Sequence, residues 1–190
     1  MHIARIFPRF ALVLGCLLLM QCGVHVQPKF TEDLDQFFGT YEGNTLSVTK
    51  GEISERELAV TIKPWEKKGF TIEWTTVIFL PDGEKRVVSP SINFYSSERP
   101  GIFASSMTND SFGNMVPYDP LKKNADPYVW AGLEENTLTV SALYILEHGS
   151  YELHVYSRTL KDEGLELHFE RINNGKKMTE ILAMLERVNS

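Results

Sequence analysis

From Phe37 onward the chain is built of short runs rich in β-branched and aromatic residues, separated by turn residues. The runs fall at 37–48, 57–65, 69–80, 84–96, 101–107, 127–133, 137–147, 150–159 and 164–172. Short apolar or alternating runs bounded by Gly, Pro, Asn and Asp are typical of β-strands. The sequence therefore predicts an all-β domain.

Most of the connections between these runs are short, which favours an antiparallel up-and-down meander. A sheet of this size can close on itself and remove its edges, so the expected architecture is a barrel of about 8 to 10 strands. A two-sheet sandwich is the structural alternative. In residues 178–188, Ile181, Leu182, Leu185 and Val188 recur at helical spacing, which predicts a short C-terminal amphipathic helix packed on the barrel.

Two hairpins define an expected register. The dipeptide 148–149 fits a two-residue turn and pairs Ala142 with Val155, whereas 161–163 followed by Gly164 fits a three-residue turn with a glycine bulge and pairs Val155 with Phe169. In this register the apolar and polar side chains separate onto opposite faces, and Arg158 lies beside Glu166. The residues expected on the outer, polar face are His154, Tyr156, Arg158, Glu166, His168 and Glu170.

The first residues have the pattern of an export signal. Arg5 and Arg9 precede an apolar run over 10–20 that is too short to span a bilayer comfortably. Residues 1–21 are therefore predicted to be a signal peptide. The composition of the rest is that of one ordinary soluble domain.

Leu19-Met20-Gln21-Cys22 resembles the bacterial lipobox, in which the cysteine is acylated and becomes the mature N-terminus. The resemblance implies lipidation at Cys22, a tether over 22–36 and a folded domain over 37–190. The alternative is an apolar leader that merely contains cysteines. The protein is thus expected to be exported to a bacterial cell envelope and held in a membrane by its lipid.

Charge and cysteine usage narrow the function classes. The net charge is −6 and there is no cluster of Lys and Arg, which makes nucleic acid and anionic membrane surfaces poor candidates as partners. Both cysteines, Cys16 and Cys22, lie in the N-terminal segment, so the folded part has neither a disulfide framework nor a thiolate metal site.

No catalytic signature stands out. The sequence has no nucleophile elbow, phosphate-binding glycine loop or metallopeptidase helix. His154, His168 and Glu170 could supply metal ligands, but the expected register puts them on a flat outer face without a cavity. We therefore predict no catalytic residue, no metal site and no cofactor.

Gly39-Thr40-Tyr41 on the first strand resembles the Gly-x-Trp motif of the lipocalin and wider calycin group, with Tyr in place of Trp. That group also has an Arg near the end of its last strand, and Arg171 occupies this place in the expected strand order. The resemblance implies a lipocalin-like barrel in which Tyr41 and Arg171 close the floor by a cation–π contact. It also implies binding of a small apolar molecule inside the barrel.

Aromatic residues indicate where such a molecule would lie. The loop over 108–126 is long for a compact domain and contains apolar residues that could cover a barrel mouth. The expected walls of the site are Trp74, Tyr128, Trp130 and Tyr144. The predicted function is an envelope-located binding module for an apolar or lipid-like ligand. The alternatives are a membrane-anchored interaction protein with a solid core and an envelope enzyme acting on an apolar substrate.

Overall fold

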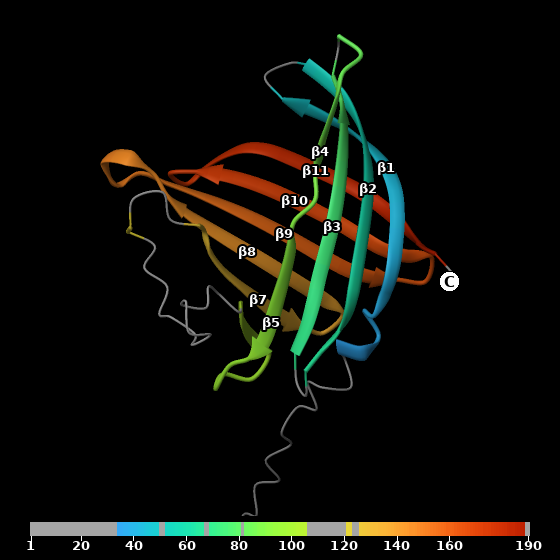
Figure 1. Cartoon of the computed structure of the whole chain (residues 1–190), viewed down its shortest axis with the longest axis vertical. Helices are drawn as coiled ribbons and strands as arrows, with labels where there is room; N and C mark the ends of the chain where they lie inside the picture. Colours follow the sequence, from blue (N-terminus) through green and yellow to red (C-terminus); the bar gives the residue numbers. More distant parts are fainter. Residues whose placement is uncertain are drawn as a thin grey trace, which may run out of the picture.

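The computed structural model describes residues 34–49, 52–66, 69–80, 82–105, 121–122 and 126–188. Figure 1 shows a single antiparallel barrel, in which β1 to β3 on one side run at a steep angle to β8 to β11 on the other. The strands are β1 (Gly39–Thr49), β2 (Glu52–Trp65), β3 (Gly69–Phe79), β4 (Lys85–Val88), β5 (Ser91–Ser96), β6 (Ile102–Ser105), β7 (Tyr128–Glu134), β8 (Thr137–Ile145), β9 (Tyr151–Lys161), β10 (Gly164–Asn173) and β11 (Lys176–Val188).

The barrel closes through pairing of β2 with β3. The strand order is β2-β1-β11-β10-β9-β8-β7-β6-β5-β3, and the additional β2–β3 ladder joins the two ends into a ring of 10 strands. Every ladder is antiparallel, from the β1–β2 hairpin to the long-range β1–β11 pair. The predicted all-β antiparallel barrel is confirmed. Within the described ranges, no helix has the length and apolar character needed to cross a bilayer.

The run predicted over 84–96 is two strands rather than one. β4 pairs with Thr76–Phe79 of β3, and β5 pairs with Gly69–Glu73 of the same strand. Pro90 lies between them, and a proline cannot donate to a sheet ladder. Its carbonyl still accepts a hydrogen bond of 3.1 Å from the Trp74 amide. Among the described strands, β4 pairs with β3 alone, so one of its edges carries no described partner.

The predicted C-terminal helix over 178–188 is wrong, because these residues form β11. Thr179, Ile181, Ala183 and Leu185 are buried, whereas the residues between them are exposed, which is the period of a strand. β11 pairs with β10 on one side and with β1 on the other. A helix would leave both of those ladders without a partner, so closure of the barrel decides the outcome.

The predicted register is also wrong, because the lengths of both turns differ by one residue. Residues 147–149 form a three-residue turn, and Ala142 pairs with His154 instead of Val155. Residues 162–163 form a two-residue turn, and Phe169 pairs with Tyr156. One turn is a residue longer than predicted and the other a residue shorter, so β8 and β10 keep their predicted register relative to each other and present the predicted side chains to the interior. Only β9, which lies between them, presents its opposite face to the interior.

This reversal of β9 has consequences for the interior. His154, Tyr156 and Arg158 face the inside of the barrel, and Arg158 pairs with Leu167 instead of approaching Glu166. Glu166 lies on the outer face and forms an ion pair of 3.4 Å with Lys161.

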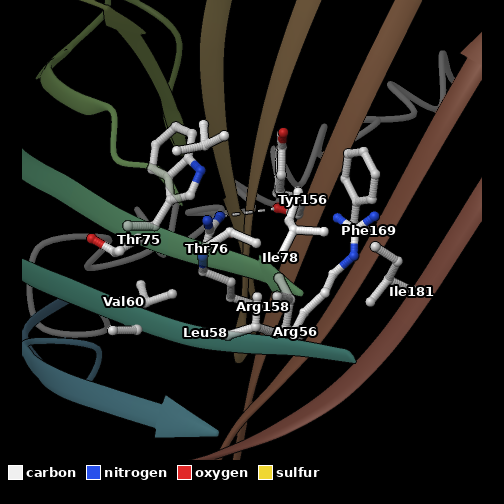
Figure 2. Close-up of a pocket in the computed structure, with 14 residues that line it drawn as sticks. Arg56, Leu58, Val60, Thr75, Thr76, Ile78, Tyr156, Arg158, Phe169 and Ile181 are labelled. Carbon is white, nitrogen blue, oxygen red and sulfur yellow. Dashed lines mark hydrogen bonds between the residues drawn. The ribbon is translucent and has the colours of Figure 1, made fainter. Parts of the chain in front are cut away.

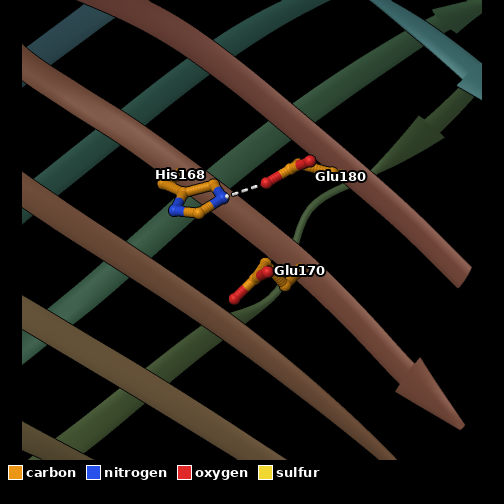
Figure 3. A group of neighbouring side chains, drawn as sticks. All are labelled: His168, Glu170 and Glu180. Atoms are coloured by element: carbon orange, nitrogen blue, oxygen red, sulfur yellow. Dashed lines mark hydrogen bonds and ion pairs between the residues drawn. The ribbon is translucent and has the colours of Figure 1, made fainter. Parts of the chain in front are cut away.

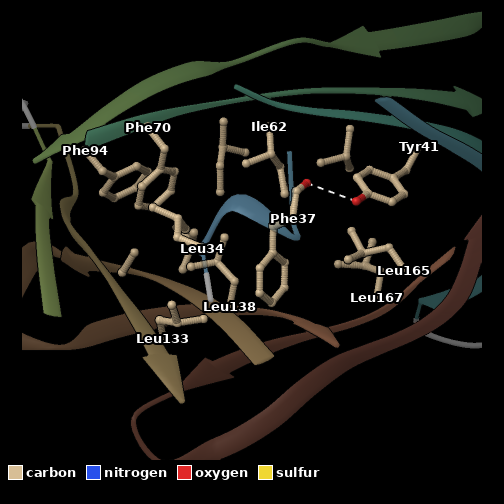
Figure 4. Packing of buried hydrophobic residues seen from close by; sticks show 14 of the residues in the cluster. Leu34, Phe37, Tyr41, Ile62, Phe70, Phe94, Leu133, Leu138, Leu165 and Leu167 are labelled. Atoms are coloured by element: carbon tan, nitrogen blue, oxygen red, sulfur yellow. Dashed lines mark hydrogen bonds between the residues drawn. The ribbon is translucent and has the colours of Figure 1, made fainter. Parts of the chain in front are cut away.

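A helical turn over residues 34–37, directly before β1, fills one end of the barrel. Leu34 and Phe37 point inward from this turn and pack with Phe70 and Leu138, as Figure 4 shows. Leu34, which the sequence places in the tether, is thus part of the core. The buried Tyr41 hydroxyl donates a hydrogen bond of 3.0 Å to the Phe37 carbonyl and holds the turn in place.

The arginine over Tyr41 is Arg187 and not Arg171. The Arg187 guanidinium lies 4.8 Å from the centroid of the Tyr41 ring and bonds to its hydroxyl. It also donates hydrogen bonds of 2.7 Å to the carbonyls of Gln36 and Phe38. Arg171 instead pairs with His154, away from Tyr41. The correction follows from the extra strand: β11, not β10, is the last strand, and its terminal arginine is Arg187.

Candidate ligand-binding site

A cavity of about 150 Å³ lies inside the barrel, above the filled end. β2 and β3 line it on one side and β9, β10 and β11 on the other, so the two halves of the barrel face each other across it (Figure 2). Inward side chains of alternate strand positions supply most of the lining. The described lining residues are Arg56, Leu58, Ala59, Val60, Trp74, Thr75, Thr76, Ile78, Val88, Tyr156, Arg158, Leu167, Phe169 and Ile181.

Aromatic rings form a continuous wall along the cavity. The ring centroids of Trp74 and Tyr156 are 5.6 Å apart, and those of Tyr156 and Phe169 are 4.6 Å apart. The wall continues beyond the cavity to His154, whose ring lies 5.7 Å from Phe169 and 4.8 Å from Tyr144. Contacts at these separations are favourable and hold the rings in defined positions.

Arg158 is the most deeply buried charged side chain of the site. It is 1% exposed, and its guanidinium carbon lies 5.7 Å from the Trp74 ring and 5.6 Å from the Tyr156 ring. One terminal nitrogen donates a 3.4 Å hydrogen bond to the Tyr156 carbonyl, and Nε has no hydrogen-bond partner. Burial lowers the pKa of Arg158 to about 10, partly offset by Tyr156, so the group remains a cation at neutral pH.

Arg56 reaches the same cavity from β2. Its Nε is also buried without a hydrogen-bond partner, and burial lowers its pKa. Figure 2 shows Arg56 and Arg158 extended among the apolar lining residues. Burial raises the pKa of Tyr156, which lies between these cations, to about 12. No described lining residue is acidic, so the cavity combines apolar walls with two positive charges.

A second polar group lies beside the aromatic wall on β9 and β10. His154 Nε2 and Glu152 Oε1 are 2.6 Å apart, and both side chains are mostly buried. Burial raises the pKa of Glu152, but the hydrogen bond and charge of His154 and the charge of Arg171 together lower it below its usual value. Burial and the charge of Glu152 raise the pKa of Tyr144. The negative charge of the Glu152 carboxylate thus compensates the positive charge of Arg171.

The structure separates the four aromatic residues predicted to line a site. Trp74 lines the cavity, and Tyr144 points inward next to His154. Tyr128 and Trp130 lie on the outer face of β7, because they alternate with Val129 and Ala131, which point into the core. Their rings lie 5.7 Å apart on that outer face. The predicted lid at 108–126 falls mostly outside the described residues.

Sequence reasoning missed Arg158, Tyr156 and Arg56. Leu153 and Val155 alternate with His154, Tyr156 and Arg158 along this strand, so polarity alone predicts that His154, Tyr156 and Arg158 face outward. Only the turn lengths, which determine the register, could have placed Arg158 inside.

A cluster on the outer face has the composition of a metal site. One ligand atom each from His168, Glu170 and Glu180 lie within 4.8 Å of one another (Figure 3). Lys177 lies 2.9 Å from Glu180 and 3.4 Å from Glu170, and His168 lies 2.9 Å from Glu180. The hydrogen bond of Lys177 lowers the pKa of Glu180. The cluster is therefore already bridged by a cation, and His154, on the opposite face, cannot join it.

Comparison with known proteins finds distant likenesses among solved structures. No protein-family model and no curated protein matches the chain. The S-type phycobiliprotein lyase of Guillardia theta is 12% identical, covers 84% of this chain and 92% of its own, and has a TM-score of 0.37. A Bacteroides fragilis protein described as exported, with a YMCC-like fold, is 13% identical over 80% of this chain and 96% of its own, with a TM-score of 0.28. At these values neither likeness assigns the chain to a family.

Proposed function

We propose that this protein is a binding module that holds a small, largely apolar molecule inside its barrel. The observation that carries the proposal is the cavity, which is lined by aromatic and aliphatic side chains from both halves of the barrel. Sites for small molecules are typically concave and mostly apolar, with a few polar groups that orient the ligand. A barrel core that served stability alone would have no reason to leave this space unfilled.

The size of the cavity limits the ligand. A space of about 150 Å³ is comparable with cavities that hold a benzene-sized molecule. Val88 at its edge is 39% exposed, so the cavity reaches the surface beside β4. A short hydrocarbon or a single ring fits inside, and a longer molecule would extend past β4.

Two neighbouring valines of β4 provide a test. Val88 lines the cavity, whereas the preceding Val87 is 60% exposed and does not belong to the lining. We expect Val88→Trp to weaken binding of short-chain apolar probes by about ten-fold or more, because the indole competes for the same space. Val87→Trp should leave it unchanged. Isothermal titration calorimetry with octanoate and octanol measures both. Absence of binding to the parent protein would reject the binding function.

The envelope location and lipid anchor belong to the same proposal, and they rest on the N-terminal sequence. Cys22 lies outside the described residues. We expect Cys22→Ser to move the protein from the membrane fraction to the soluble fraction, because acylation requires the thiol. Cys16→Ser is the matched control and should leave the protein in the membrane. Fractionation followed by mass measurement of the N-terminus checks the result, and a mature N-terminus beyond Val24 would contradict lipidation.

A further inference from the structure

The interior of the barrel contains positive charge that no described acid neutralises. Arg56 and Arg158 both reach the cavity, and their Nε atoms are buried without a hydrogen-bond partner. A buried cation without an anionic partner is costly, because it gives up hydration without gaining an ion pair. Buried charges in proteins are therefore usually paired or serve a ligand.

Other cations of the chain show the contrast. Lys63 lies 2.6 Å from Glu73, and Lys161 lies 3.4 Å from Glu166. The Nε of Arg171 is also buried without a hydrogen-bond partner, but the charge of Arg171 acts on the nearby acid Glu152, and Arg187 donates to backbone carbonyls. These partners are present even at positions that water reaches. Arg158, which water does not reach, has only aromatic rings and one long hydrogen bond to a carbonyl.

Resting on the binding function proposed above, we propose that the ligand is an amphipathic acid, whose carboxylate or phosphate binds Arg158 and Arg56 while its hydrocarbon part packs on the aromatic wall. The planar guanidinium presents its donors as a fork that matches the two oxygens of such a group. The rings of Trp74 and Tyr156 flank the Arg158 guanidinium and hold it in place. The site is thus organised before the ligand arrives, which lowers the cost of binding.

The experiment compares ligands that differ only in the head group. Octanoate, octyl phosphate and octanol are titrated calorimetrically into the parent protein and into Arg158→Met, Arg56→Met and Arg86→Met. Arg86 lies on β4, is exposed and does not line the cavity, so it controls for a general change in charge. Octyl phosphate against octanoate distinguishes a lipid-phosphate source of the acid from a free carboxylic acid.

We expect the parent protein to bind at least one of the two acids about ten-fold or more tightly than octanol, because hydrogen bonds to a charged group contribute that much. Arg158→Met should remove this preference of acid over alcohol, and Arg86→Met should retain it. Equal affinities for acid and alcohol, or an acid preference that survives in both Arg158→Met and Arg56→Met, would overturn the acid site and leave the binding function intact. Failure of all three ligands to bind would reject the binding function itself. Near-UV circular dichroism confirms that each variant is folded.

Discussion

In the ligand-free protein, Arg158→Met is expected to raise the free energy of unfolding by about 1–3 kcal/mol. The side chain is 1% exposed, and its burial lowers its pKa from the ordinary arginine value to about 10, so the folded state penalises the charge. Methionine is unbranched and apolar, and it can replace the arginine stem against Trp74 and Tyr156 without a charge to bury. Urea unfolding followed by tryptophan fluorescence measures the change. A charged side chain that serves ligand binding often destabilises the folded protein when no ligand is bound.

The pH dependence of this effect has a defined sign. Because burial lowers the folded-state pKa of Arg158 to about 10, below its unfolded value, the unfolded state binds more protons at pH values between the two. The cost of the charge is fully present well below pH 10 and is relieved as the pH rises through the folded-state pKa. The stability difference between Arg158→Met and the parent protein should therefore shrink between pH 7 and pH 11. The exposed Arg86→Met should stay within about 0.5 kcal/mol of the parent at both values. A less stable Arg158→Met protein at pH 7 would show that the ring contacts outweigh the desolvation.

The fold class was accessible from the sequence because strand periodicity and turn residues act locally. The barrel and ten of the eleven strands follow from those patterns, although one predicted run proved to be two strands. The missing strand had a signal of its own. Asn174-Gly175 is a strong hairpin dipeptide, and both residues have the positive φ that such a turn requires. Ile181, Ala183 and Leu185 then alternate as inward residues of a strand. Leu182 next to Ile181 also fits a helical stripe, and only pairing with β1 decides between the two patterns.

The site could not be predicted as well as the fold, because it depends on register. A change of one residue in a turn reverses every side chain of a strand. Residues 147–149 can be read as a turn of either two or three residues, and the choice moves Arg158 from solvent to the centre of the barrel. Trp74 was predicted at the site because it occupies alternate positions with Ile72 and Ile78, which places all three on one face of the strand. Tyr128 and Trp130 were not distinguishable from inward residues, since Val129 and Ala131 are also apolar.

Arg187→Met is expected to lower the free energy of unfolding by about 1–3 kcal/mol, the opposite sign to Arg158→Met. Its guanidinium joins the last strand to the N-terminal turn through Tyr41 and the carbonyls of Gln36 and Phe38. Losing it leaves these acceptors without their donor and loosens the turn that carries Phe37 into the core.

A double-mutant cycle identifies the arginine that closes the barrel. Arg187→Met combined with Tyr41→Phe should show a coupling energy of about 1 kcal/mol, because the two side chains are in direct contact. The matched cycle with Arg171→Met should show none, since Arg171 pairs with His154 on another part of the wall. Urea unfolding of the single and double variants gives both values. Coupling of Tyr41 to Arg171 but not to Arg187 would mean that β10, and not β11, supplies the closing residue, and the assignment of the last strand would then be wrong.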